Sequence, residues 1–97
     1  MDRGPTFGQI RGMTYTLLQL ALGSYDLFLD GKIIGAVVRG GTKISPIWIA
    51  ELLPEERLTH RPDPFTEVEH EFTSFQELRR WLGNPSVRPA KGVGQPN

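Results

Sequence analysis

The sequence predicts an α+β domain, in which an antiparallel β-sheet of four or five strands, starting with an N-terminal meander, carries one C-terminal α-helix packed on one face. Two dipeptides predict the meander. Gly23-Ser24 and Asp30-Gly31 lie between apolar runs and favour the two-residue turns of tight β-hairpins. The helix is predicted by residues 75–82, where apolar side chains recur at helical spacing.

The register of the meander follows from its alternating apolar residues. If Leu22 lies opposite Tyr25 and Leu29 opposite Lys32, one face collects a continuous apolar set, which a slip of one residue would scatter. The expected inward set is Leu18, Leu20, Leu22, Tyr25, Leu27, Leu29, Ile34, Ala36 and Val38. The expected outward set is Leu17, Gln19, Ala21, Asp26, Phe28, Asp30, Ile33, Gly35 and Val37, with Ile47 and Ile49 beside it.

Two further strands are expected after a loop at residues 39–46. Residues 47–53 alternate with Trp48 on the inward side, and residues 67–72 alternate with His70 inward and glutamates outward. The outward charges suit an edge strand, because they discourage further pairing. Residues 54–66 between these strands are polar and contain prolines, so we expect a loop there.

Both ends of the helix are indicated by local signals. Ser74 followed by Glu77 forms a capping box, and Gly83 supplies a left-handed stop. The apolar side of this helix, which is expected to cover the sheet, consists of Phe75, Leu78, Trp81 and Leu82.

Length and composition predict one domain with two tails. A chain of 97 residues is too short for two domains with a cleft between them. Residues 1–13 and 85–97 are rich in Gly and Pro and poor in large apolar groups, so both are expected to be disordered around a domain at residues 14–84. The apolar run at residues 17–22 is too short for a membrane span and begins late for a secretory signal, which leaves the cytoplasm as the expected location.

The polar residues match no pattern for catalysis, cofactor binding or metal binding. With no Cys, the chain has no thiol nucleophile and no disulfide. The spacing of His60, His70 and the acidic residues between them matches no compact zinc motif. The run from Gly40 to Lys43 is not followed by the helix that a phosphate-binding loop needs. We therefore expect a non-catalytic protein without cofactor or metal.

The outward face of the meander is the most informative functional signal. Its apolar centre is expected to be Phe28, Ile33, Val37 and Ile49, with Arg39 and Lys43 at the rim. A single-layer sheet leaves this face open unless the N-terminal segment or the 54–66 loop folds over it, with Phe7 or Phe65 as a plug. The first prediction is a small bacterial-type binding or regulatory module that makes protein–protein contacts there, with an unknown partner or with itself as a homodimer, and no membrane.

DNA binding is the alternative prediction. Several strands followed by a helix resemble the plan of AP2-like and integrase arm-type DNA-binding domains, in which the sheet enters the major groove. The resemblance implies duplex contacts from the sheet and the 39–46 loop, with Arg39, Lys43 and the pair Arg79-Arg80 reaching phosphates. The equal counts of 11 basic and 11 acidic residues disfavour this role, because phosphate contacts depend on clustered cations. The segment at residues 69–83 is also similar to a strand-to-helix ending in small bacterial proteins without assigned function, which implies no site.

Overall fold

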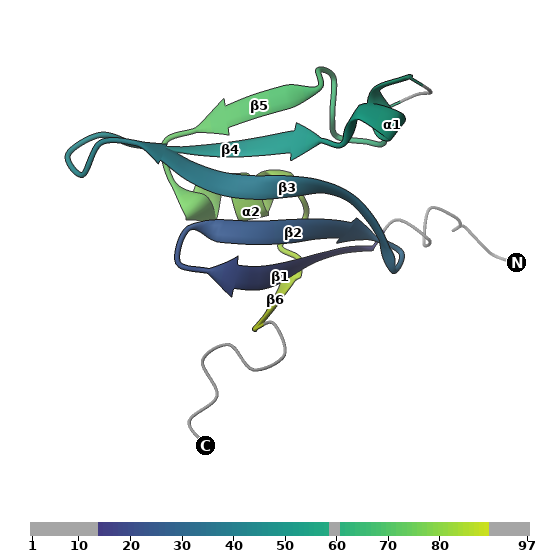
Figure 1. Cartoon of the computed structure of the whole chain (residues 1–97), viewed down its shortest axis with the longest axis horizontal. Coiled ribbons are helices and arrows are strands. Elements are labelled where there is room, and N and C mark those ends of the chain that lie inside the picture. Colours follow the sequence, from purple (N-terminus) through teal and green to yellow (C-terminus); the bar gives the residue numbers. More distant parts are fainter. Residues whose placement is uncertain (1–13, 59–60, 90–97) are drawn as a thin grey trace, which may run out of the picture.

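The computed structural model describes residues 14–58 and 61–89, which form one six-stranded mixed sheet with two helices (Figure 1). The strand order is β5-β4-β3-β2-β1-β6, and every neighbouring pair is antiparallel except β1 and β6, which run parallel. The elements are β1 (Tyr15–Ala21), β2 (Ser24–Leu29), β3 (Lys32–Gly41), β4 (Pro46–Leu52), α1 (Pro54–Leu58), β5 (Glu69–Phe72), α2 (Phe75–Trp81) and β6 (Ser86–Pro89).

The predicted α+β class is confirmed, and the course of α2 decides which face of the sheet is covered. β5 and β6 form opposite edges of the sheet, and α2 is the helix that connects them. The connection therefore crosses the sheet on one side, where Figure 1 shows α2 behind the strands. Within the described part of the chain, no second layer covers the opposite side.

The ends of α2 agree with the sequence signals. The Ser74 hydroxyl accepts a hydrogen bond from the Glu77 backbone N–H at 3.1 Å, which satisfies one of the free donors at the helix start. The Glu77 carboxylate in turn accepts from the hydroxyl of Thr73 at 2.8 Å. Gly83 takes a φ of 88° directly after the helix, a conformation that glycine adopts without strain.

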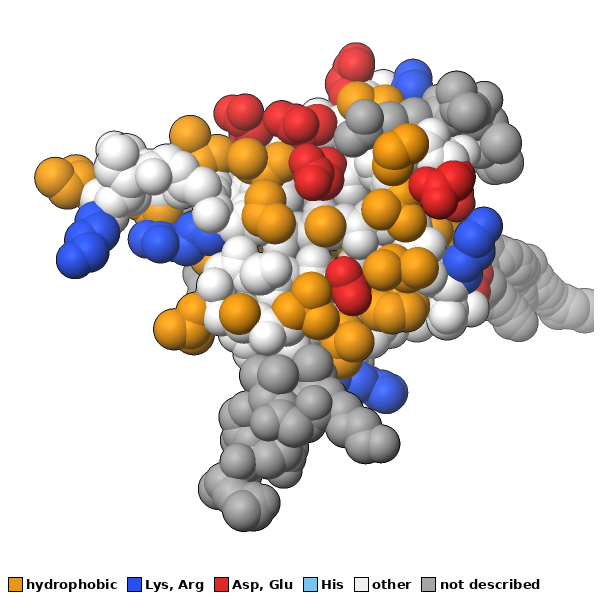
Figure 2. Space-filling view, viewed as in Figure 1, with side chains coloured by type: hydrophobic (Ala, Val, Ile, Leu, Met, Phe, Trp, Pro, Cys, Tyr) orange, Lys and Arg blue, Asp and Glu red, His pale blue; other side chains and the backbone are white. Residues whose placement is uncertain are grey.

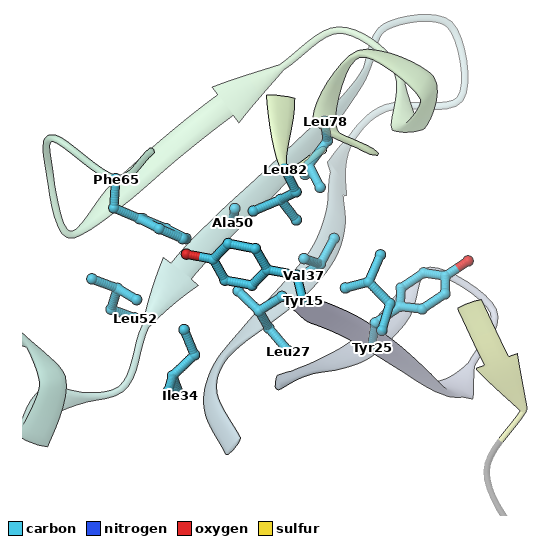
Figure 3. Close-up of a cluster of buried hydrophobic side chains, with 11 residues drawn as sticks. Tyr15, Tyr25, Leu27, Ile34, Val37, Ala50, Leu52, Phe65, Leu78 and Leu82 are labelled. Atoms are coloured by element: carbon cyan, nitrogen blue, oxygen red, sulfur yellow. The ribbon is translucent and has the colours of Figure 1, made fainter. Parts of the chain in front are cut away.

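The hydrophobic core lies between α2 and the sheet (Figure 3). Leu78 is the deepest side chain of α2, and Trp81 is half-buried among the rings of Phe65, His70 and Phe72. The core residues are Tyr15, Leu17, Tyr25, Leu27, Ile34, Val37, Ala50, Leu52, Phe65, Leu78 and Leu82.

The predicted register of β1 is wrong by three residues, because Gln19 and not Leu22 lies opposite Tyr25. Leu17, not Leu18, lies on the core side, where it faces Leu27. The turn is Leu22-Gly23 in place of Gly23-Ser24, which accounts for two of these residues and leaves Leu22 95% exposed. A bulge between Gln19 and Ala21 accounts for the third and reverses the face of the strand beyond it. Leu17 and Leu18 are adjacent leucines, so hydrophobicity alone allows either register.

The expected register of β3 is correct at its turn and wrong beyond it. Asp30 and Gly31 have φ of 53° and 86°, as a type I′ turn requires, and Leu29 faces Lys32 as predicted. A bulge then places both Ile34 and Gly35 on the buried side of the sheet. Because the bulge adds one residue, the later part of β3 is inverted relative to the prediction.

The bulge moves Val37 into the core and moves Ala36 and Val38 to the opposite face. Gly35 makes this arrangement sterically possible, since a Cβ at that position would collide with the backbone carbonyl oxygen of Glu51 in β4. The outward placement of Val37 is therefore wrong, and its side chain is 0% exposed.

Two elements lie where the sequence indicated none. α1 occupies the start of the expected 54–66 loop, and β6 lies within the segment assigned to the C-terminal tail, beyond the expected domain end at Asn84. β6 joins the sheet through its backbone while its side chains are exposed, so it carries no apolar pattern. The disorder expected for residues 1–13 and 90–97 lies outside the described residues.

Candidate interaction surface

The side of the sheet opposite α2, called the open face below, carries a continuous set of apolar side chains. Cross-strand pairing identifies its residues, because directly paired residues share a face and their chain neighbours lie in the core. Figure 2 looks onto this face, with hydrophobic side chains spread over the middle strands. The apolar set is Leu18, Phe28, Ile33, Ala36, Val38, Ile47 and Ile49.

A row of carboxylates crosses the open face perpendicular to the strands. Asp26 of β2 pairs with Ala36 of β3, Ala36 with Glu51 of β4, and Glu51 with Glu69 of β5. Glu71 lies in the next row, beside Ile49. The red side chains in Figure 2 lie mainly toward the β5 edge, with one amid the apolar residues. The open face therefore combines apolar surface with negative charge.

None of these carboxylates has an ion-pair partner among the described residues. The ion pair recorded for the described side chains joins Lys32 to Glu56 at 3.2 Å, near the β2–β3 turn. That contact compensates the charge of Lys32. Asp26 and Glu51 are each partly buried, so their charges are left facing apolar neighbours and solvent.

The opposite edge of the open face has a shallow depression with the opposite charge. Its volume is about 340 Å³, and it lies over β1 and β2 beside β6. The lining residues are Thr16, Leu18, Phe28, Gly31 and Arg88. Arg88 is exposed and pairs in register with Leu18, which places this cation at the edge of the sheet farthest from the glutamates of β5.

The structure brings three of the six residues named from the sequence onto the open face. Phe28, Ile33 and Ile49 lie there, and Ile33 is 38% exposed. Val37 is in the core instead. The two basic rim residues do not lie on the open face as predicted. Arg39 pairs with Trp48, which packs on Phe75 of α2, so Arg39 is exposed on the α2 side of β3, and Lys43 is exposed in the turn before β4. These cations are therefore set apart from the apolar centre.

Sequence reasoning missed Leu18, Val38, Glu51 and Arg88. Leu18 and Val38 were assigned to the core because the two bulges have no hydrophobic signature. Glu51 alternates with Ala50 and Leu52 and could have been placed outward from that signal alone. Arg88 could not be placed, because nothing in the side chains of residues 86–89 indicates a strand.

The structure tests one of the two phenylalanines, Phe7 and Phe65, that were expected to cover the open face. Phe65 is buried on the α2 side, where its ring lies 4.9 Å from that of Trp81, so it does not cover the open face. Phe7 lies outside the described residues.

The residues around Phe65 are held by Tyr15, whose hydroxyl donates to the Asp63 carbonyl at 2.6 Å. Burial, reinforced by the negative charges of Asp63 and Asp30, raises the pKa of Tyr15 to about 12.

His70 is surrounded by backbone N–H donors and an aromatic ring. Its Nε2 accepts backbone N–H hydrogen bonds from Thr66 and Glu67, both at 3.1 Å, and its ring lies 4.7 Å from that of Trp81. His60 lies outside the described residues. The described acidic and histidine side chains form no group of three or more that could hold a metal ion. No helix in the described ranges is long and apolar enough to cross a membrane.

Comparison with known proteins adds no further assignment. No protein-family model, curated protein or solved structure matches this chain. The functional argument therefore depends on the chemistry of the open face.

Proposed function

We propose that the protein is a small non-catalytic binding or regulatory module that contacts a protein partner through the open face. One observation supports this most strongly: a single-layer sheet carries a contiguous apolar set on the side that no described element covers. Contiguous exposed apolar surface with a polar rim is typical of protein interaction sites. Isolated exposed leucines or isoleucines would carry no such meaning.

The shape of this surface favours a macromolecular partner over a small molecule. The depression near Arg88 has a volume of about 340 Å³, near the lower end of the range for ligand pockets of about 300–1,000 Å³. It forms one end of a broad face whose other apolar residues, including Val38 and Ile49, lie outside it. A partner that spans several strands would use the whole apolar set.

DNA binding by the sheet is a weaker candidate. Lys43 offers a cation in the turn before β4, but Arg39 lies on the α2 side of β3, away from the face that would meet the duplex. A duplex placed on the open face would bring phosphates against Asp26, Glu51, Glu69 and Glu71. Phosphate contacts stabilise a complex through released counterions at cationic side chains, and these carboxylates would oppose them. Addition of a mixed-sequence duplex at low salt is expected to leave the amide NMR signals of β2 and β3 unchanged.

Site-specific photo-crosslinking in the native host cell tests the proposed function. A photoreactive phenylalanine analogue at Ala36 places the probe at the middle of the open face, and the same analogue at Gln76 places it on the exposed side of α2. The proposal predicts a discrete protein adduct from position 36, absent from position 76 and lost when Ile49→Asp is added. Equal adducts from both positions, or none from position 36, would contradict it.

A further inference from the structure

The charges of the open face restrict the chemistry of its partner. Asp26 and Glu51 lie among the apolar residues, and Glu69 and Glu71 lie at the β5 edge, whereas Arg88 is the cation at the far edge. A partner that buries the apolar set must also cover Asp26 and Glu51. A carboxylate that is covered without a cation or hydrogen-bond donor is strongly destabilising. The partner must therefore supply cations or hydrogen-bond donors opposite these carboxylates, and cations give the stronger, charge-assisted contact.

A second copy of the chain fits this requirement poorly. If two open faces stack about a two-fold axis along the strands, the β5 edge of one copy faces the β6 edge of the other. Arg88 could then meet Glu69, but Asp26 and Glu51 would face Ala36 and Leu18 of the other copy. If the axis runs across the strands, the acidic edges lie against each other. Each arrangement leaves carboxylates without compensation.

The spacing of the carboxylates indicates the form of the partner. Neighbouring strands lie about 4.8 Å apart, so Asp26 on β2 and Glu51 on β4 are separated by roughly 10 Å across the sheet. Residues seven apart on one side of an α-helix are also separated by about 10 Å along its axis. A helix lying across the strands can thus place a cation near each carboxylate from a single face.

We propose that the open face binds a basic amphipathic α-helix of another protein, with Lys or Arg residues about two turns apart flanking an apolar stripe. The stripe packs on the rows of Ala36, Val38 and Ile49, and the cations meet Asp26 and Glu51. Beyond Asp26, a further apolar side chain of the helix enters the depression lined by Leu18 and Phe28. This inference rests on the proposed function, since it names the partner class of the same surface.

Peptide titration of the isotope-labelled full chain tests the inference by NMR. The probe is a synthetic amphipathic helix of about 16 residues with two Lys seven positions apart beside a leucine stripe. Two matched peptides carry Gln or Glu at both Lys positions. At low salt, the Lys peptide is expected to shift the amides of β1 to β4, with about three- to tenfold tighter binding than the Gln peptide and no binding by the Glu peptide.

Variants of the protein test whether Asp26 and Glu51 cause the preference for the Lys peptide over the Gln peptide. The double change Asp26→Asn with Glu51→Gln is expected to remove the preference for the Lys peptide over the Gln peptide. The control Glu55→Gln removes an exposed carboxylate on α1, which is not among the paired strand residues that define the open face, and should keep the preference. Unchanged dispersion of the amide spectrum shows that each variant is folded.

The possible outcomes separate the inference from the proposed function. Equal affinity of the Lys and Gln peptides for the open face, or a double variant that keeps the preference, would overturn the inference and leave the proposed function standing. Absence of binding up to millimolar Lys peptide, or shifts confined to α2, would also overturn the inference. A position-36 adduct that is a second copy of the chain would overturn it too, while supporting protein contact at the open face.

Discussion

The two faces of the sheet come from the same strands and differ in what covers them. Leu17 and Leu18 are adjacent in β1, yet Leu17 is in the core and Leu18 lies on the open face. Val37 and Val38 show the same contrast in β3. Both faces are rich in aliphatic residues, so composition does not distinguish them. The distinction comes from α2, which must cross the sheet on one side to connect its two edges.

The difference in burial between the two faces is tested most strongly by placing the same charge on each side of β3. Val37→Asp puts an unpaired carboxylate into the core, and we expect a loss of more than about 4 kcal/mol in the free energy of unfolding, close to the whole stability of a domain of this size. Val38→Asp faces solvent and should cost roughly 1 kcal/mol or less. Urea unfolding followed by circular dichroism measures both. Similar losses would contradict the placement of Val37 and Val38 on opposite faces of the sheet.

A second test concerns the glycine at that bulge. Gly35→Ala would place a Cβ against the Glu51 carbonyl oxygen, a backbone atom that cannot move without disturbing β3–β4 pairing, and should cost about 3 kcal/mol. Gly40→Ala in the same strand meets only the end of the Ile49 side chain, at 3.8 Å, and should be nearly neutral. Thermal unfolding of the two variants decides the matter, and equal stability would argue against the close approach at Gly35.

Alkaline pH tests the core side of the comparison through Tyr15. Its pKa is raised from 10.0 to about 12, so the folded chain holds this proton more tightly than the unfolded chain. The resulting stabilisation, about 2 kcal/mol, is complete below pH 10 and is lost as the pH rises toward 12. Tyr15→Phe should show a smaller loss of stability between pH 10 and 12 than the unchanged protein. Parallel pH profiles for the two proteins would refute the assigned environment.

The smallest effect is expected at the start of α2. Ser74→Ala removes the acceptor for the Glu77 N–H and should destabilise the protein by about 1 kcal/mol. Ser86→Ala, at an exposed position in β6, is the matched control and should leave the unfolding midpoint unchanged. A neutral Ser74→Ala would show that the helix start is held by packing alone.

Local signals made part of this fold predictable. The Asp30-Gly31 turn and the caps of α2 follow from residues whose conformational preferences are strong and short-range. The sides of β4 were also predictable, because the buried Ala50 and Leu52 alternate with the half-buried Ile49 and Glu51. The α+β class followed from these elements.

The remainder depends on backbone events that side chains do not encode. A bulge adds one residue and moves every residue beyond it, counted from the turn, to the other face of the sheet. The wrong faces predicted for Leu18 and Val37 therefore each come from one extra residue. β6 pairs through its backbone and exposes its side chains, which left Arg88 without a predicted position. As a result, Phe28, Ile33 and Ile49 were placed correctly, but the carboxylates that restrict the partner were not recognised as one row.

Methyl NMR with a soluble paramagnetic gadolinium chelate tests most directly whether one face is core and the other is free to bind. The account predicts strong relaxation enhancement for the methyl groups of Leu18, Ile33, Val38 and Ile49, and protection for those of Leu17, Leu27, Val37 and Leu78. Protection of both sets in the isolated chain would show that the open face is already covered, and would contradict the account.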